Sequence, residues 1–256
     1  MAKESQKKVF QTGTGIFGEG TPKICVPIVE NSREDIWRRA EEIERLPVDI
    51  VEWRADFYRD AFRTEEFVET LKGIKIRLSK KPLLFTFRTA REGGNRSVDP
   101  DDYYRLNQAA ASEGADLVDV ETFLDEERTA EETEKLHASN AGCHVLASNH
   151  DFEKTPSVEE MVRRLKRMEE LGADVAKLAV MPVCPQDVLN LLQATVTANE
   201  LLAVPVVTMS MGNMGVLSRI CGSLTGSAMT FAAVGKASAP GQISAEHMTK
   251  ILKIIV

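Results

Sequence analysis

The chain has 256 residues, of which 43% are hydrophobic and 28% charged, and its formal net charge is -7 at pH 7. This length and composition fit a globular protein with one large domain or two small ones, and α/β barrels commonly reach this size as one domain. The acidic balance argues against nucleic acid or an anionic membrane as the main partner, although a local cationic pocket is compatible with it.

The cysteines and the N-terminal residues give a second set of exclusions. The four cysteines form no Cys-x-x-Cys pair and have no histidine at metal-ligand spacing: Cys25, Cys143, Cys184 and Cys221. This pattern disfavours a zinc site and a disulfide framework, so we expect reduced, mostly buried thiols. The first ten residues, MAKESQKKVF, lack the apolar core of a signal peptide, and no apolar run approaches the ~20 residues that span a bilayer. We therefore expect a cytoplasmic protein without a membrane partner.

Eight short apolar runs recur at steady intervals along the chain and predict strands. They occupy residues 23–29, 49–56, 82–89, 117–123, 144–152, 175–182, 204–211 and 228–234. Polar segments with helical periodicity lie between most of them. In the segment 157–172, one apolar stripe precedes Gly172, which stands where a helix C-cap belongs: Val158, Met161, Val162, Leu165 and Met168. A further helix is predicted over 187–202, which opens with an aspartate shortly after a proline.

The alternation of strands and helices predicts the fold class. Strands that alternate with helices at this spacing form right-handed βαβ units and a parallel sheet. Eight such units without an intervening linker favour a single closed (β/α)8 TIM barrel that comprises residues 1–256. Residues 1–22 precede the first strand, and their turn-rich segment GTGIFGEGTP predicts a hairpin-like extension that covers the N-terminal mouth of the barrel.

The sixth run, VAKLAVMP at 175–182, places one lysine in an otherwise apolar strand. Successive side chains of a strand point to opposite faces, so Ala176, Leu178 and Val180 face the helices and Lys177 points into the barrel. A charged amine is costly to bury without a partner, so this position requires an explanation.

Other strands also direct polar side chains into the barrel, mostly near their C-terminal ends. The strand pattern gives this orientation to Glu52, Arg54, Asp56, Arg88, Asp119, Glu121, Ser148 and His150. A barrel interior is normally filled with branched aliphatic side chains, and barrel active sites are built at the C-terminal ends of the strands. The charged set therefore predicts a polar active-site pocket at that end.

Lys177 and the loop residue Glu92 also have simpler interpretations. Lys177, taken alone, is equally compatible with a structural salt-bridge network around Asp119 and Glu121. Glu92 lies in the loop segment REGGN, where a carboxylate is solvated by default.

The four histidines differ in their predicted positions. His137 and His247 lie in helical patterns and are expected at the surface, whereas His144 begins its strand, far from the active end. Only His150 combines the inward face with the C-terminal end of a strand, which favours a functional role.

An inward lysine beside a histidine predicts a particular chemistry. Burial or neighbouring cations lower the pKa of an amine toward neutrality, and a neutral amine attacks a ketone or aldehyde to form a Schiff base. His150 suits a general base, and Glu92 could orient its imidazole. An anionic substrate and a cationic field around the lysine are predicted by Arg54, Arg88 and Arg219. The sequence has no nicotinamide, flavin or P-loop fingerprint, so no cofactor is expected.

Eight stretches carry a resemblance to a known family. They are VEWRADF, PLLFTFRTAREGGN, SNHDFEKTP, GADVAKLAVMP, TMSMG, GVLSRICG, GSAMTFAAV and KASAPGQIS, in this order across the barrel. With them the chain resembles the type I 3-dehydroquinate dehydratases. The resemblance implies a TIM barrel of the class I aldolase type that dehydrates 3-dehydroquinate to 3-dehydroshikimate, the third step of chorismate and aromatic amino acid biosynthesis. It also implies an imine mechanism without metal or cofactor, and a homodimer.

The same resemblance implies roles for individual residues. Lys177 would form the Schiff base, His150 would take the proton next to the imine and help to expel the hydroxyl as water, and Glu92 would pair with the histidine. Substrate-binding roles would fall to Glu52, Arg54, Arg88, Arg219 as carboxylate ligand, Ser238, Gln242, Met209, Met211 and Phe231. The pattern alone favours ordinary core positions for the two methionines, and the resemblance replaces that interpretation with a pocket wall.

The chain departs from the family pattern at two places. Many members carry a serine in the first strand that reaches the substrate, and Pro27 occupies that position here. Several members have a lysine after the seventh strand, where this chain reads MGNMG with Asn213 and Met214. We expect altered binding strength but unchanged chemistry. The segment 236–243 resembles the loop that closes over bound substrate and excludes water from the imine.

Two rival functions stay open on the sequence alone. A class I aldolase acting on a sugar phosphate would use the same lysine, with MGNMG and VGKAS as phosphate loops. A barrel that binds a small carboxylic acid without converting it would need no catalytic role for Lys177, His150 and Glu92.

Overall fold

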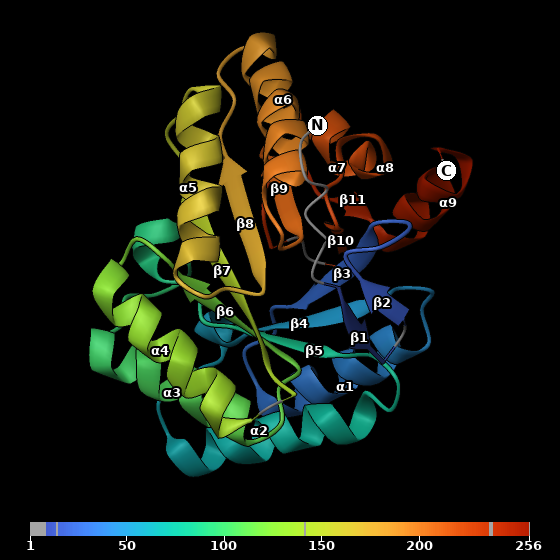
Figure 1. Ribbon diagram of the computed structural model, residues 1–256. Helices are drawn as coiled ribbons and strands as arrows, with labels where there is room; N and C mark the ends of the chain where they lie inside the picture. The colour runs from blue at the N-terminus through green and yellow to red at the C-terminus, as the bar shows by residue number, and fades with distance from the viewer. Residues whose placement is uncertain (1–8, 14, 141, 236–237, 256) are drawn as a thin grey trace.

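Eight parallel strands form a curled sheet in the order in which they occur along the chain (Figure 1). The computed structural model describes residues 9–13, 15–140, 142–235 and 238–255. The eight strands are β3 (Lys23–Ile28), β4 (Ile50–Arg54), β5 (Leu83–Thr86), β6 (Leu117–Glu121), β7 (His144–Asp151), β8 (Val175–Val180), β9 (Val206–Ser210) and β10 (Met229–Ala233). The two ends of the sheet meet at an isolated bridge between Val206 and Ser227, where the amide of Ala228 donates to the carbonyl of Val206 at 2.8 Å. The predicted (β/α)8 barrel is confirmed, and a short strand, β11 (Ile243–Ser244), pairs with β10 outside the ring.

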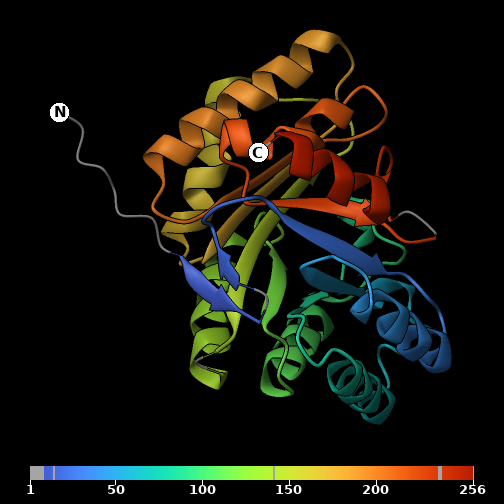
Figure 2. The ribbon, with the colours of Figure 1, turned by 90° about the vertical axis from the view of Figure 1, so that its right-hand side faces the viewer.

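Helices cover the outer surface of the sheet (Figures 1 and 2). They are α1 (Arg33–Glu44), α2 (Thr64–Arg77), α3 (Pro100–Ser112), α4 (Glu126–Ser139), α5 (Val158–Glu170), α6 (Pro185–Leu201), α7 (Val216–Ile220), α8 (Gly222–Thr225) and α9 (Ala245–Ile255). The predicted stripe of α5 is buried at Met161, Leu165 and Met168, and the helix begins where Ser157 caps the amide of Glu160 at 3.3 Å. In the described part of the chain, no helix is long and apolar enough to cross a membrane.

The barrel interior has an apolar half and a polar half. The apolar half contains Cys25, Ile50, Leu84, Leu117, Leu146, Val175 and Val207, which lie toward the N-terminal ends of their strands. The outward side chains of β8, by contrast, pack against the helical layer, as the alternation predicted. The polar residues of the predicted site therefore lie in the C-terminal half of the barrel, above this apolar layer.

A short antiparallel hairpin covers the N-terminal mouth (Figure 2), as predicted. Its strands are β1 (Phe10–Thr12) and β2 (Gly15–Phe17). Phe17 is fully buried in the apolar half of the interior, and the ring of Phe10 stacks on His144, the first residue of β7, with ring centroids 3.8 Å apart. The hairpin thus closes this end of the barrel through the packing of its two phenylalanine side chains.

All eight strands are shorter than the predicted runs, and the differences at β4 and β5 affect the site. β4 ends at Arg54, and Ala55–Phe57 form the 3-10 helix η1, so Asp56 leaves the strand face on which it was expected. The turn lets the Asp56 carboxylate accept two hydrogen bonds from Arg54, both at 2.8 Å, and one from the amide of Asn95 at 2.9 Å. β5 ends at Thr86, and Arg88 therefore lies beyond the strand rather than at its end.

The cysteines agree with the expectation of free thiols. Cys25, Cys143 and Cys221 are buried, Cys184 is half-buried, and none of the four is disulfide-bonded.

Candidate active site

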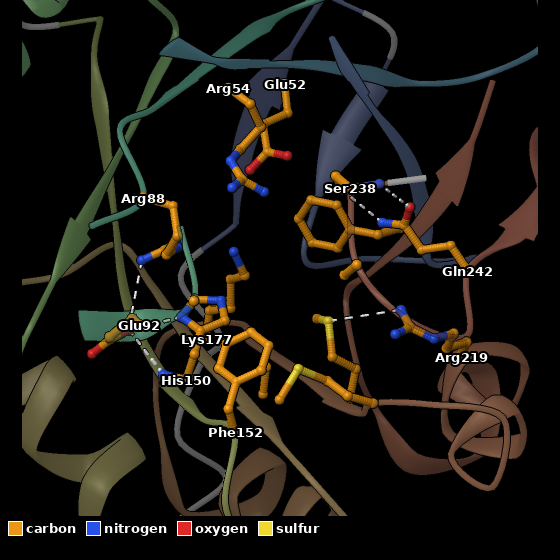
Figure 3. A pocket seen from close by; sticks show the side chains of 16 residues that line it. Glu52, Arg54, Arg88, Glu92, His150, Phe152, Lys177, Arg219, Ser238 and Gln242 are labelled. Atoms are coloured by element: carbon orange, nitrogen blue, oxygen red, sulfur yellow. Dashed lines mark hydrogen bonds and ion pairs between the residues drawn. The ribbon is translucent and has the colours of Figure 1, made fainter. Parts of the chain in front are cut away.

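A cavity opens among the C-terminal ends of the barrel strands (Figure 3). It is lined by every residue for which the sequence predicted a catalytic or binding role: Glu52, Arg54, Arg88, Glu92, His150, Lys177, Met209, Met211, Arg219, Phe231, Ser238 and Gln242. These residues lie on five strands, β4, β7, β8, β9 and β10, or in the segments that follow β5, β9 and β10, so only the closed barrel brings them together.

Lys177 projects from the middle of β8 and is 3% exposed. Its Nζ donates to Oδ2 of Asp119 on β6 at 3.1 Å and lies 4.8 Å from the centroid of the Phe231 ring. Asp119 also accepts from Ser148 at 2.6 Å and from Arg88 at 2.7 Å. Burial alone would raise the pKa of Asp119, but Arg88 and Lys177 lower it below its ordinary value, so this carboxylate stays ionised beneath the lysine.

His150 and Glu92 form a hydrogen-bonded pair beside the lysine. His150 is in register with Ala179, two residues beyond Lys177 on the neighbouring strand, so the imidazole and the amine line the same wall. Oε2 of Glu92, from the 3-10 helix η2 (Ala90–Glu92), accepts from Nδ1 of His150 at 2.8 Å and from its backbone amide at 2.9 Å. Because Nδ1 is engaged, Nε2 is the nitrogen left for a substrate.

The electrostatic surroundings shift both members of this pair. Burial and the neighbouring Glu121 raise the pKa of Glu92 to about 8, against the opposing effect of Arg88. Burial lowers the pKa of His150 well below its ordinary value, and Arg88 and Lys177 add to this effect. Imidazole is therefore neutral in the pocket, as a general base must be before it acts.

Two of the predicted cationic residues are already paired with carboxylates. Arg54 is bound by Asp56, and Arg88 donates to Glu121 and Ser148, each at 3.0 Å, as well as to Asp119. Burial alone would lower the pKa of Arg88, but the surrounding carboxylates raise it well above its ordinary value. Both guanidinium groups therefore balance buried carboxylates around the pocket.

Arg219 differs from them because it has no carboxylate partner among the residues that the structure describes. It is 2% exposed, and its Nη2 donates to the carbonyl of Pro240 at 3.0 Å. Its Nε is buried without a hydrogen-bond partner in the described chain, and burial lowers the pKa of this guanidinium to about 10. A buried cation with an unused donor is suited to bind an anion.

The segment after β10 reaches over the cavity. Residues 236 and 237 of the predicted loop 236–243 lie outside the described residues. Ser238 and Gln242 bond each other through two hydrogen bonds of 3.0 Å. Gly241 has a φ of 76°, and a Cβ on it would lie 2.2 Å from the carbonyl oxygen of Gly212, so this close contact requires glycine. The segment 238–242 is thus packed against the loop that follows β9.

One part of the cavity wall is apolar. Met209, Met211 and Phe231 are buried, belong to the apolar packing of the interior and also line the pocket. The two interpretations of the methionines are therefore compatible. Pro27 is buried in β3, in register with Glu52, and does not line the cavity.

The sequence did not single out several residues that complete the site. Phe152 lies at the cavity with its ring 6.5 Å from that of His150. Asn149, on the strand face opposite to His150, donates from Nδ2 to Oε1 of Glu92 at 3.0 Å. Both lie in the segment SNHDF, whose motif could have drawn attention to them, but their partners are distant in sequence.

Comparisons with known proteins agree with this geometry. The sequence model of the type I 3-dehydroquinase family matches residues 24–256. A 3-dehydroquinate dehydratase of Bacillus licheniformis is 46% identical over 251 residues, which cover 97% of this chain and 98% of the relative. One of Listeria monocytogenes is 47% identical over 240 residues, covering 93% and 94%.

Solved structures give the same result. The crystal structure of a type I 3-dehydroquinate dehydratase from Clostridium difficile, with covalently modified comenic acid, superposes with a TM-score of 0.93 at 43% identity and covers 97% of this chain and 98% of that one. The enzyme of Geobacillus kaustophilus has a TM-score of 0.93 at 37% identity, with 98% of each chain covered. The chain belongs to the type I 3-dehydroquinase family.

Proposed function

We propose that this protein dehydrates 3-dehydroquinate to 3-dehydroshikimate in the shikimate pathway, through a Schiff base on Lys177. The observation that carries the proposal is a buried amine that shares a cavity with a neutral imidazole and its carboxylate partner. Membership of the family and the names of its relatives supply the substrate.

The first step forms the imine. The ammonium group of Lys177 first gives up one proton, and the resulting neutral amine attacks the ketone carbon. A carbon–nitrogen bond forms, and the ketone oxygen leaves as water with that proton and a second proton from the nitrogen. The product is a protonated imine, whose positive charge lies where the ammonium group was. Asp119, 3.1 Å from Nζ and held ionised by Arg88, stabilises this charge.

The second step removes the elements of water. Nε2 of His150 takes a proton from the carbon next to the imine, and the electron pair of that bond moves toward the imine nitrogen to give an enamine. The enamine then expels the hydroxyl group, which leaves as water with the proton that His150 returns. Hydrolysis of the new imine by one water molecule releases the product and restores Lys177.

The substrate carboxylate is assigned to Arg219. Its unused donor and its burial suit one planar anion, and the pair Ser238 and Gln242 lies close enough to line the same cavity. The apolar part of the wall, Met209, Met211 and Phe231, limits the access of bulk water to the imine.

The charge balance also separates this proposal from the aldolase alternative. Arg54 and Arg88 are paired with carboxylates, which leaves Arg219 as the cation without such a partner among the described pocket residues. One such cation matches a monocarboxylate, whereas a sugar phosphate brings about two negative charges at neutral pH. No observation favours binding without turnover.

Reductive trapping tests the proposal directly. Incubation with 3-dehydroquinate and sodium borohydride is expected to give one covalent adduct per chain, seen as a mass increase of the intact protein. Peptide mapping should place it on Lys177. An adduct formed only with a sugar phosphate would support the aldolase, and no adduct with either ketone would refute the imine mechanism.

We also propose that the protein is a homodimer in the cytoplasm. The proposed dimer interface is the surface over α6, α7 and α8. The chain is acidic and like-charged surfaces repel each other. The helix α6 has 17 residues but only two charged side chains, so two copies of this surface repel each other little. Exposed apolar side chains gather on these packed helices: Leu189, Val196, Leu201, Leu217 and Leu224. Light scattering is expected to give twice the chain mass of 28.3 kDa, and a mass near 28.3 kDa would contradict the dimer.

A further inference from the structure

A chain of hydrogen bonds runs from the outer surface of α5 to the Glu92–His150 pair. Nη1 of Arg164 on α5 donates to Oδ1 of Asn149 at 3.0 Å, and Nδ2 of Asn149 donates to Oε1 of Glu92 at 3.0 Å. Oε2 of Glu92 then accepts both N–H groups of His150. Asn149 is 9% exposed and Glu92 is 8% exposed, so the inner part of this chain is shielded from water.

Arg164 determines which end of the Asn149 amide faces the active site. A side-chain amide can present either its oxygen or its NH2 group, and the two ends have nearly the same shape. A guanidinium group has donors only, so Arg164 attracts the oxygen and turns the NH2 group toward Glu92. Arg164 is itself held by Glu160, with Nε 2.8 Å from Oε1, and by Asp151 at 3.5 Å.

Because the NH2 group of Asn149 binds one oxygen of Glu92, the two oxygens of this carboxylate have different partners. Oε1 is occupied by Asn149, and Oε2 is left to accept from Nδ1 of His150. With the hydrogen fixed on Nδ1, the lone pair of the imidazole lies on Nε2. We propose that Asn149, oriented by Arg164, is a positioning residue that keeps Glu92 an acceptor for His150, an inference that rests on the proposed role of His150 as the base.

The charges around Glu92 explain why such a residue is needed. Glu121 and Asp119 on β6 disfavour a second anion, whereas Arg88, after β5, and the Asn149 amide favour it. Without the amide, Glu92 gains a proton at higher pH and donates to Nδ1 of His150. The hydrogen of the imidazole then lies on Nε2, which can no longer accept a proton from the substrate.

The sign of the pH dependence follows from this exchange. As the pH falls, Glu92 takes up a proton, the base form of the pair is lost and kcat/KM declines. The wild-type acid limb is therefore expected well above the ordinary range of a carboxyl group, because burial and Glu121 raise the pKa of Glu92. Loss of the Asn149 donor should move this limb further up.

The test uses Asn149→Asp and Arg164→Ala, with Arg163→Ala as the matched control. Arg163 pairs with the same Glu160, at 2.7 Å, but its side chain is 62% exposed and it is not bonded to Asn149. Asn149→Asp preserves the shape and replaces the donor with a second carboxylate, which also repels Glu92, whereas Arg164→Ala adds no charge next to Glu92. We expect kcat to fall about 100-fold in Asn149→Asp and about tenfold in Arg164→Ala, with KM nearly unchanged. The acid limb should shift up by about one pH unit in Asn149→Asp and in the same direction in Arg164→Ala. Arg163→Ala should follow the wild-type profile, and Arg164→Lys should regain part of the lost rate.

Borohydride trapping separates this inference from the proposed function. Lys177 is unchanged in the variants, so each is expected to form the adduct as wild type does. If wild type is trapped and the Asn149→Asp and Arg164→Ala profiles coincide with that of wild type, Asn149 has no positioning role. A loss confined to KM, or an equal loss in Arg163→Ala, would refute it as well. If Asn149→Asp does not fold, the pH profile of Arg164→Ala, a change at a half-buried residue, decides. Failure to trap wild type would refute the imine mechanism itself.

Discussion

Lys177→Ala is expected to lower kcat by about 10⁵-fold or more, because Lys177 is the amine that lines the cavity in the part of the chain that the structure describes. The substrate can still enter, since Arg219, Ser238 and Gln242 are untouched. The rate of dehydration is measured by the ultraviolet absorbance of the conjugated double bond in the product.

The fold should survive this change. Asp119 keeps its hydrogen bonds from Arg88 and Ser148, so removal of the amine does not leave a buried carboxylate without a partner. Lys81→Ala is the matched control, because the side chain of Lys81 is 9% exposed and its Nζ bonds the carbonyl of Glu44, away from the cavity. It should retain wild-type turnover.

Lys177→Arg distinguishes covalent from electrostatic catalysis. It preserves the positive charge opposite Asp119 but has no amine that can become neutral and attack a ketone. Activity within about 100-fold of wild type in either Lys177 variant is incompatible with an imine intermediate.

His150→Ala is expected to lower kcat by roughly 10³-fold and to leave imine formation intact. The base is lost, but Lys177 and Asp119 keep their positions. Glu92 also keeps two donors, the Asn149 amide and the backbone amide of residue 150. Rapid mixing with 3-dehydroquinate followed by borohydride should therefore trap an adduct on Lys177 in this variant, although product appears slowly.

His144→Ala provides the control on the same strand. His144 begins β7 at the opposite end of the barrel, where it stacks on Phe10. Its loss could weaken the hairpin but should not change the rate per folded molecule. If His150→Ala gave no adduct, His150 would be needed for imine formation, and its assignment to proton abstraction would be wrong.

The sequence predicted the faces of the strands well, for a simple physical reason. Alternation has a period of two residues, so one anchor such as the aliphatic set around Lys177 orients a whole strand. Once the barrel is inferred, the inward residues near the strand ends must share one cavity. The positions of Lys177, His150 and Glu52 follow from this local rule alone.

Contacts between side chains that are distant in the chain could not be predicted from the sequence. The pairing of Arg88 with Asp119, Glu121 and Ser148 depends on how far each side chain extends across three strands, which no local pattern encodes. Strand ends were also missed, because Asp56 turns away to bind Arg54. Asn149 was overlooked because a residue on the helix-facing side of a strand is normally unrelated to the cavity.

The closed N-terminal end of the barrel restricts the route by which molecules enter and leave the active site. Because Phe17 and the apolar layer above it fill the N-terminal half of the barrel, the described residues leave one entrance to the cavity, at the C-terminal ends of the strands. Substrate, the hydrolytic water and product therefore all pass through this entrance, beneath the segment 238–242. The entrance must therefore be open when substrate binds and again when product leaves. The rate of product release consequently depends on the same end of the barrel at which the product forms.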